Sequence, residues 1–166
     1  MIDYEQFSSI ETSSLLTAFP SNEEIGIHLQ TAANTLPRYA EYFSAGVSVD
    51  GRPLHGLLLT DREFSDDNKS QVVLSAAEHG TEKNAAVVLL LLLRELTETP
   101  VGRQILQHQK LVLLPVVNPD GYDHCAFTNR NGVNLFADFH FDRRPSQPEA
   151  KILAEILDRF MPELFV

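Results

Sequence analysis

The stretch QVVLSAAEHGTEKNAAVVLLLLL, residues 71–93, decides the fold of this chain. Its first part, 72–77, is a short run with apolar residues on both faces, which is typical of a strand inside a sheet covered on both sides. Its last part belongs to a helix that we expect from about Glu82 to Thr97 and that should be deeply buried, because its leucine-rich body is apolar nearly all round. Between them lies a polar segment, AEHGTEKN, that neither element explains.

The segments on either side of this stretch predict an α/β fold. Residues 111–118, LVLLPVVN, form a second buried strand, and the segments 39–49 and 53–60 are expected to pair, because Asp50-Gly51 between them is a hairpin signal. Further helices are expected at 21–36, 101–109 and 148–163. Strands that alternate with helices predict a mixed, partly parallel sheet flanked by helices on both faces.

The first of these helices carries clear signals at both ends. Ser21 can cap it, and Glu24 stands three residues later, as in a capping box. Pro37 stops it.

The C-terminal end of the chain is apolar. Leu164–Val166 look like the start of another buried strand, whereas chain ends are usually polar. We therefore expect the 166 residues to be the front part of a longer domain.

Composition limits what the protein binds. Apolar residues make up 43% and charged residues 22% of 166 residues, as in one ordinary globular domain. The net charge of −10 argues against a nucleic-acid partner. The longest apolar run, Ala85–Leu93, is much shorter than the roughly 20 residues of a membrane span. The single cysteine, Cys125, allows no internal disulfide, and no signal peptide is apparent. We therefore expect a cytoplasmic protein. The sequence does not determine its oligomeric state.

The polar segment is a candidate metal site. His79 and Glu82 follow the strand at 72–77, where it turns into a helix, and ligands of open α/β sheets bind at such strand ends. Gly80 allows a tight bend between them. Imidazole and carboxylate are both zinc ligands at about 2 Å, so their ligating atoms should come within roughly 4 Å of each other. The alternative is a solvated surface pair, because H-x-x-E is common by chance.

A second polar cluster follows the next strand. Asn118-Pro119-Asp120-Gly121 is turn chemistry at a strand end, and taken alone it is best interpreted as a turn. In a parallel arrangement this strand end should lie near the first. A lone Arg130 follows in the polar loop TNRNG.

Together these segments resemble the zinc carboxypeptidase family of the carboxypeptidase A/B type. In that family the order is GRP after a strand, then H-x-x-E, NPDG, an arginine and G-V-D-L-N-R. The matching segments here are VSVDGRPLHGLLLT at 47–60, HGTE at 79–82, PVVNPDGY at 115–122, Arg130, and GVNLFADF at 132–139. The resemblance runs from about residue 43 to the end, and the order of five elements is much more specific than any one of them.

The resemblance implies roles for particular residues. His79 and Glu82 would be the first two ligands of a zinc ion, and Arg130 would polarise the scissile carbonyl and steady the oxyanion. The NPDG segment would be structural. Residues 1–42 would form an N-terminal helical lead-in, and 43–166 the front part of a single catalytic domain.

Two departures from the family pattern are visible. Phe136-Ala137 stand where the family has the Asn-Arg pair that clamps a terminal carboxylate, and neither can form charge-assisted hydrogen bonds. Arg143 and Arg144 are possible substitutes. The family's third ligand and its general-base glutamate would come after residue 166. Within this chain only two further histidines are within reach as a third ligand, namely His124 and His140.

The leading hypothesis is a zinc-dependent hydrolase of peptide or amide bonds, of metallocarboxypeptidase type, with zinc activating the attacking water. The 166 residues alone would be inactive. One alternative is a degenerate family member that binds peptide or zinc without turnover, which the loss of the Asn-Arg pair supports. Another is an acylamino-acid deacylase, which NPDG followed by GVNL disfavours. A nucleotide-binding domain ranks last, because no glycine-rich phosphate loop is present.

Overall fold

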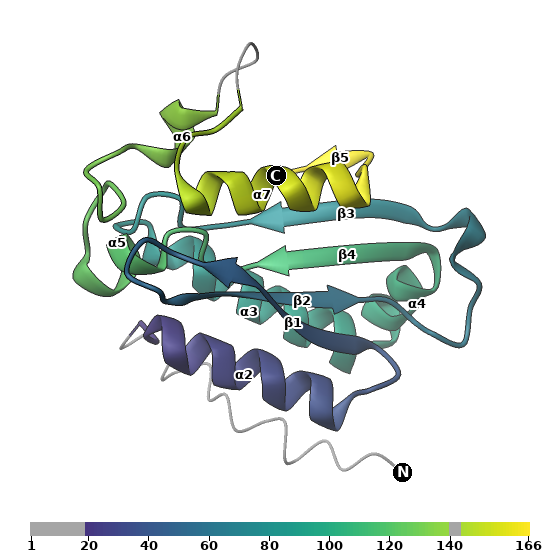
Figure 1. Ribbon diagram of the computed structural model, residues 1–166. Coiled ribbons are helices and arrows are strands. Elements are labelled where there is room, and N and C mark those ends of the chain that lie inside the picture. Colours follow the sequence, from purple (N-terminus) through teal and green to yellow (C-terminus); the bar gives the residue numbers. More distant parts are fainter. Residues whose placement is uncertain (1–18, 140–143) are drawn as a thin grey trace.

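The computed structural model describes residues 19–139 and 144–166 and shows a mixed sheet with helices on both faces (Figure 1). Its strands are β1 (Ala40–Val47), β2 (Pro53–Leu59), β3 (Ser70–Ser75), β4 (Gln109–Leu114) and β5 (Leu164–Phe165), in the order β1-β2-β4-β3-β5. β3 runs parallel to β4 and β5, and β2 is antiparallel to β1 and β4. The predicted fold class is confirmed.

Most of the helices begin at a residue whose side chain caps them. They are α2 (Asn22–Thr35), α3 (Lys83–Glu98), α4 (Pro100–His108), α5 (Pro119–His124), α6 (Leu135–Asp138) and α7 (Pro148–Phe160). The capping box of α2 is confirmed, because the Ser21 hydroxyl accepts from the Glu24 amide and the Glu24 carboxylate accepts from the Ser21 amide. Among the described residues, no helix is both long and apolar enough to cross a membrane.

The sheet separates two apolar cores. Val72, Leu111 and Leu113 point to the face that α2, α3 and α4 cover, and they belong to one buried cluster. Their neighbours along the strands, Val73 and Val112, point to the other face and pack with α7. Side chains alternate between the faces of a strand, so these doubly apolar strands bury both of their faces. The helix layers on the two sides are visible in Figure 1.

Two expectations about burial are wrong. α3 is not buried all round, because Val88 is 58% exposed on the side away from the sheet. The last strand forms as expected, with Val72 opposite Leu164, but Leu164 and Phe165 are 52% and 43% exposed. The physical reason is the same in both cases, since within the described residues each element has packing partners on one side only.

The topology places the loops after β3 and β4 at one edge of the sheet. The two strands are parallel, with Ser75 opposite Leu114 in the last pair, so both chains leave the sheet together. They stay paired beyond the strands: the Val117 amide donates to the Ala76 carbonyl at 3.0 Å, and the Asn118 amide to the Ala77 carbonyl at 3.1 Å. The two polar clusters of the sequence therefore meet.

Candidate metal centre

Asn118 joins the two loops that carry the polar clusters. Its side-chain amide donates to the Glu78 carbonyl at 3.1 Å, and its side-chain oxygen accepts from the Gly121 amide at 2.9 Å. Gly80 lies against Gly121 so closely that a Cβ on Gly80 would stand 2.0 Å from the Gly121 carbonyl carbon. The segment that holds His79 is therefore fixed against the NPDG segment, backbone to backbone.

The NPDG segment itself is a helix start, not the turn expected from its composition. Asn118 caps α5 and Pro119 occupies its first turn, where a missing N–H costs nothing. Asp120 is 1% exposed and receives hydrogen bonds from the Ser48 hydroxyl at 2.8 Å, the Asp50 amide at 3.1 Å and the Arg52 guanidinium at 2.7 Å. Asp120 thus anchors the β1–β2 turn to α5.

His79 and Glu82 converge at this sheet edge, as the H-x-x-E spacing predicts. His79 Nδ1 lies 3.1 Å from Glu82 Oε1. Glu82 is the residue that precedes α3, so the helix start sets its position. The His79 side chain is 17% exposed and that of Glu82 is 56% exposed, so the pair opens to solvent.

Asn134 holds the other side of the His79 ring. His79 Nε2 is 3.0 Å from Asn134 Oδ1, and the same oxygen caps α6 by accepting from the Ala137 amide. An amide oxygen only accepts, so the ring donates from Nε2. A histidine that binds a metal usually donates its second N–H to an oxygen in this way. Sequence reasoning missed Asn134, although it stands at the Asp of the family's G-V-D-L-N-R pattern.

The residues present fit a metal ion. Both ring nitrogens of His79 face oxygen acceptors, Glu82 on one side and Asn134 on the other. A neutral imidazole has a single N–H, so when Nε2 donates to Asn134 the Nδ1 lone pair faces the Glu82 carboxylate, and a proton or a metal ion between them relieves the repulsion. The 3.1 Å separation suits two ligands at about 2 Å from one ion, so a metal ion fits here.

The described part of the chain brings together two candidate ligands and no more. No group of three or more histidine, cysteine or acidic side chains suited to a metal occurs within residues 19–139 and 144–166. His124 faces Arg52, with 3.4 Å between His124 Nε2 and Arg52 Nη2, and not His79. The other candidate, His140, lies outside the described residues.

An aromatic ring also lies on His79. The ring of Phe127 is stacked on the imidazole, with 3.8 Å between the centroids and 12° between the planes. Phe127 is nevertheless 50% exposed. No signal in the sequence pointed to this contact, because it joins two loops that are distant along the chain.

Arg130 lies apart from the pair. Its side chain is 61% exposed, and its Nε forms an ion pair with Asp50 at 3.3 Å. It lines a small cleft with Asp120 and His124. Among the contacts of the described residues, none joins Arg130 to His79 or Glu82.

The positions of the family's carboxylate clamp are at the surface. Phe136 is 68% exposed and Ala137 is exposed, both in α6. Of the possible substitutes, Arg144 is exposed and lines a shallow cleft beside α7. Arg143 lies outside the described residues.

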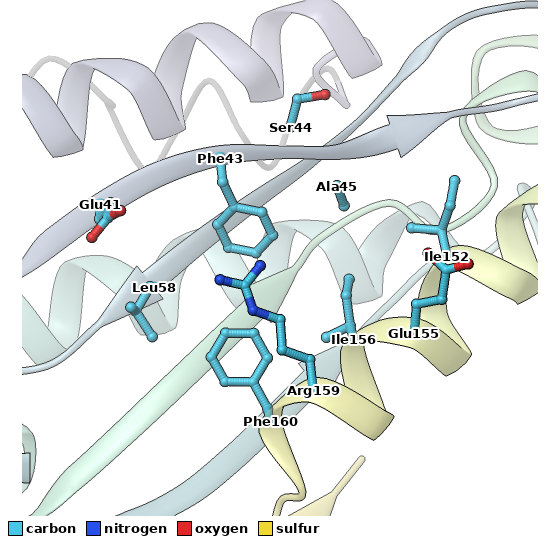
Figure 2. A pocket seen from close by; sticks show the side chains of 10 residues that line it. All are labelled: Glu41, Phe43, Ser44, Ala45, Leu58, Ile152, Glu155, Ile156, Arg159 and Phe160. Carbon is cyan, nitrogen blue, oxygen red and sulfur yellow. The ribbon is translucent and has the colours of Figure 1, made fainter.

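A separate cleft of about 280 Å³ lies between the β1–β2 hairpin and α7. Figure 2 shows Arg159 with its guanidinium between the rings of Phe43 and Phe160, above aliphatic side chains that include Leu58 and Ile156. The Arg159 guanidinium carbon is 5.7 Å from the centroid of the Phe160 ring. No histidine or cysteine is among the residues that line this cleft, and it opens on a face of the sheet, so it is not the metal centre.

Comparisons with known proteins agree with the fold. The family profile described as zinc carboxypeptidase matches residues 25–150. Carboxypeptidase B of Helicoverpa zea is 26% identical over 133 residues, which are 78% of this chain and 31% of that protein. The crystal structure of a metallo-carboxypeptidase from Burkholderia cenocepacia matches with a TM-score of 0.76 and 26% identity, over 88% of this chain and 40% of that chain.

The sheet and its edge loops are therefore those of a metallocarboxypeptidase-type catalytic domain, of which this chain is a part. It belongs to the zinc carboxypeptidase family. The chain spans less than a third of the length of the curated relatives that it matches. One of them, the inactive metallocarboxypeptidase ecm14 of Schizosaccharomyces pombe, is 24% identical over 138 residues, or 78% of this chain and 28% of that protein.

Proposed function

We propose that this chain supplies the front half of the site of a zinc-dependent hydrolase that cleaves peptide or amide bonds, with His79 and Glu82 as two of the zinc ligands. The convergence of these two side chains at 3.1 Å, with the far nitrogen of the imidazole held by Asn134, carries the proposal. Residues 1–42 would be a lead-in and 43–166 the first part of the catalytic domain.

Zinc, when bound, would supply Lewis-acid polarisation of the scissile carbonyl and a water of lowered pKa. The chain's own residues position these partners. Asn134 keeps the N–H of His79 on Nε2, which leaves the Nδ1 lone pair free to bind. Glu82 contributes an anionic oxygen from the start of α3. Arg130 is the proposed oxyanion-stabilising cation, and to reach a substrate it must release Asp50.

A second candidate is a protein that binds zinc or peptide without turnover. Two observations favour it. Phe136-Ala137 are apolar surface residues at the positions of the carboxylate clamp, and Arg130 is engaged by Asp50. The match to a relative described as inactive is compatible with this reading.

Metal content and turnover of the full-length protein separate these candidates. The variants His79→Ala and Glu82→Gln are compared with His108→Ala and Glu95→Gln, two exposed side chains in α4 and α3. We expect the wild type and both controls to keep one zinc per chain after dialysis and to cleave peptide amides, and the two site variants to lose zinc and cleavage together. Zinc retained without cleavage supports the binding protein. Zinc retained equally by His79→Ala contradicts His79 as a zinc ligand, on which the proposed hydrolase rests.

A further inference from the structure

A cleft of about 480 Å³ lies between the first turns of α2 and the start of β2. This volume is within the range of small-molecule sites. Figure 1 shows α2 beside the β1–β2 hairpin, on the face of the sheet away from α7. Neither His79 nor Glu82 lines this cleft, so it is separate from the candidate metal centre.

Two buried polar side chains that line this cleft have unpaired atoms. Asn22 is 2% exposed and His55 is 6% exposed. Among the described residues, no group forms a hydrogen bond with Asn22 Oδ1 or with His55 Nε2. Buried polar atoms are nearly always paired, so each exception needs an explanation. A ligand bound in the cleft between α2 and β2 would satisfy both atoms at once.

The partners of Asn22 and His55 define the role of each unpaired atom. The Asn22 side chain donates from Nδ2 to the Pro53 carbonyl at 3.0 Å, so its Oδ1 is an acceptor. His55 Nδ1 lies 2.9 Å from the Tyr42 hydroxyl. Burial lowers the pKa of His55, which keeps the ring neutral, and a phenol O–H is a good donor to an imidazole nitrogen. The ring therefore accepts at Nδ1 and carries its hydrogen on Nε2.

The two unpaired atoms are close enough for one ligand group to reach both. Asn22 contacts Pro53, and one helical turn later Gly26 lies against His55, where a Cβ on Gly26 would stand 2.3 Å from the ring. One turn of helix and two residues of strand each advance about 5–7 Å. Two hydrogen bonds of about 2.9 Å joined by one amide group span a similar distance. An amide also presents the required pair, a carbonyl for His55 and an N–H for Asn22.

The rim of the cleft favours an uncharged ligand with an apolar part. Ile27 is 55% exposed there and offers an apolar surface. Arg52 supplies a cation, but its guanidinium already pairs with Asp120 at 2.7 Å and with Asp123 at 3.5 Å, so a carboxylate would have to compete with two acids. The unpaired atoms are covered, and a ligand reaches them by displacing exposed side chains of α2 such as Ile27 and Gln30.

We propose that the cleft between α2 and β2 binds an uncharged amide with a branched apolar group, with His55 Nε2 donating to the amide carbonyl and Asn22 Oδ1 accepting from the amide N–H. Tyr42 is a positioning residue, because its hydroxyl keeps the hydrogen of the ring on Nε2. The amide belongs either to a free carboxamide or to a peptide bond. The site is independent of the proposed hydrolase, and its failure would leave the metal centre untouched.

The test is an NMR titration of the full-length protein near neutral pH with three probes of similar size. Isovaleramide is a free carboxamide, and its N-methyl derivative has the N–H of a peptide bond. Methyl isobutyl ketone keeps the carbonyl and the branched group but has no N–H. The readout is the nitrogen and proton chemical shifts of the His55 imidazole, which report on this cleft and not on binding elsewhere.

Two variants and one control accompany the wild type. Asn22→Leu removes the acceptor. Tyr42→Phe removes the hydroxyl bonded to Nδ1 and leaves the lining of the cleft unchanged, so it keeps the test decisive if Asn22→Leu fails to fold. The control is Asn34→Ala, an exposed position further along α2 that does not line the cleft. Circular dichroism establishes that each protein is folded.

We expect isovaleramide to shift the His55 signals of the wild type and the control, and the ketone to bind about fivefold more weakly, because one hydrogen bond is missing. Both variants should bind the amide about fivefold more weakly, and Asn22→Leu should no longer distinguish it from the ketone. Binding of the N-methyl amide as well assigns the site to peptide bonds, and binding of isovaleramide alone assigns it to free carboxamides.

Three results would overturn the proposal. The first is that neither amide shifts the His55 signals of the wild type. The second is that the wild type binds isovaleramide and the ketone equally, which removes the role of Asn22 as an acceptor. The third is that Tyr42→Phe binds isovaleramide as tightly as the wild type does, which contradicts a donor at His55 Nε2 that Tyr42 maintains.

Discussion

The substitution Asp120→Ala tests whether the NPDG segment is a scaffold. The buried carboxylate accepts from Ser48, from the Asp50 amide and from Arg52. A hydrogen bond to a charged group is worth about 1.5–3 kcal/mol, and buried donors left without an acceptor cost a similar amount. The Arg52 side chain is 31% exposed, so solvent replaces part of its contact. We therefore expect a loss of about 3–4 kcal/mol in the free energy of unfolding.

The assay is urea unfolding of the full-length protein, followed by intrinsic fluorescence and circular dichroism. Asp120→Asn keeps an acceptor oxygen but not the charge, and it should lose about half as much as Asp120→Ala. The control Asp67→Ala removes an exposed carboxylate in the loop before β3 and should change stability by less than about 0.5 kcal/mol. A loss below about 1 kcal/mol for Asp120→Ala would show that the hairpin turn does not depend on this anchor.

Three further outcomes follow from the structure. Asn134→Ala removes the acceptor of His79 Nε2 and should weaken zinc binding about 10–100-fold in competition with a chelating dye, whereas Asn134→Asp should retain it. Burial lowers the pKa of His55 and of His28, so as the pH falls the unfolded chain binds protons before the folded chain does. The free energy of unfolding should therefore be constant above about pH 6.5 and fall below it, by at most about 1.4 kcal/mol per pH unit for each histidine. His55→Gln should flatten this profile, and an unchanged profile would contradict the burial of a neutral His55. The 166-residue chain alone should self-associate through its exposed edge at Leu164–Phe165, which a sharp monomer peak in size-exclusion chromatography with light scattering would contradict.

The parts of the fold that the sequence predicts best are those with local signals. The β1–β2 hairpin follows from Asp50-Gly51, where Gly51 has a φ of 79°, a value that glycine adopts without strain. The capping box at Ser21 sets the start of α2. The start of α5 also had local signals, a capping Asn118 and Pro119 at the first helical position, but the same residues favour a turn. A tertiary contact favours the helix over the turn, because the β1–β2 hairpin holds Asp120 in place.

The parts of the site that sequence reasoning missed depend on contacts between distant segments. His79 and Glu82 are three residues apart, so their convergence can be inferred from spacing and from their place at a strand end. Asn134 and Phe127 reach His79 from more than forty residues away. No motif or spacing in the sequence indicates that Phe127 stacks on His79. The position of Arg130 was inferred from the family pattern, which carries no information on its ion pair with Asp50.

The residues at this edge of the sheet separate physically into two groups. Asn118 and Asp120 are buried and bonded to several partners, so they can be lost only at a large cost in stability. Phe136 and Phe127 are at the surface, where a change leaves the core intact. An intact NPDG segment is therefore a sign of the fold and not of turnover. The proposed activity has to be judged from His79 and the groups that touch it, because a substitution there would act on the proposed metal site without first acting on stability.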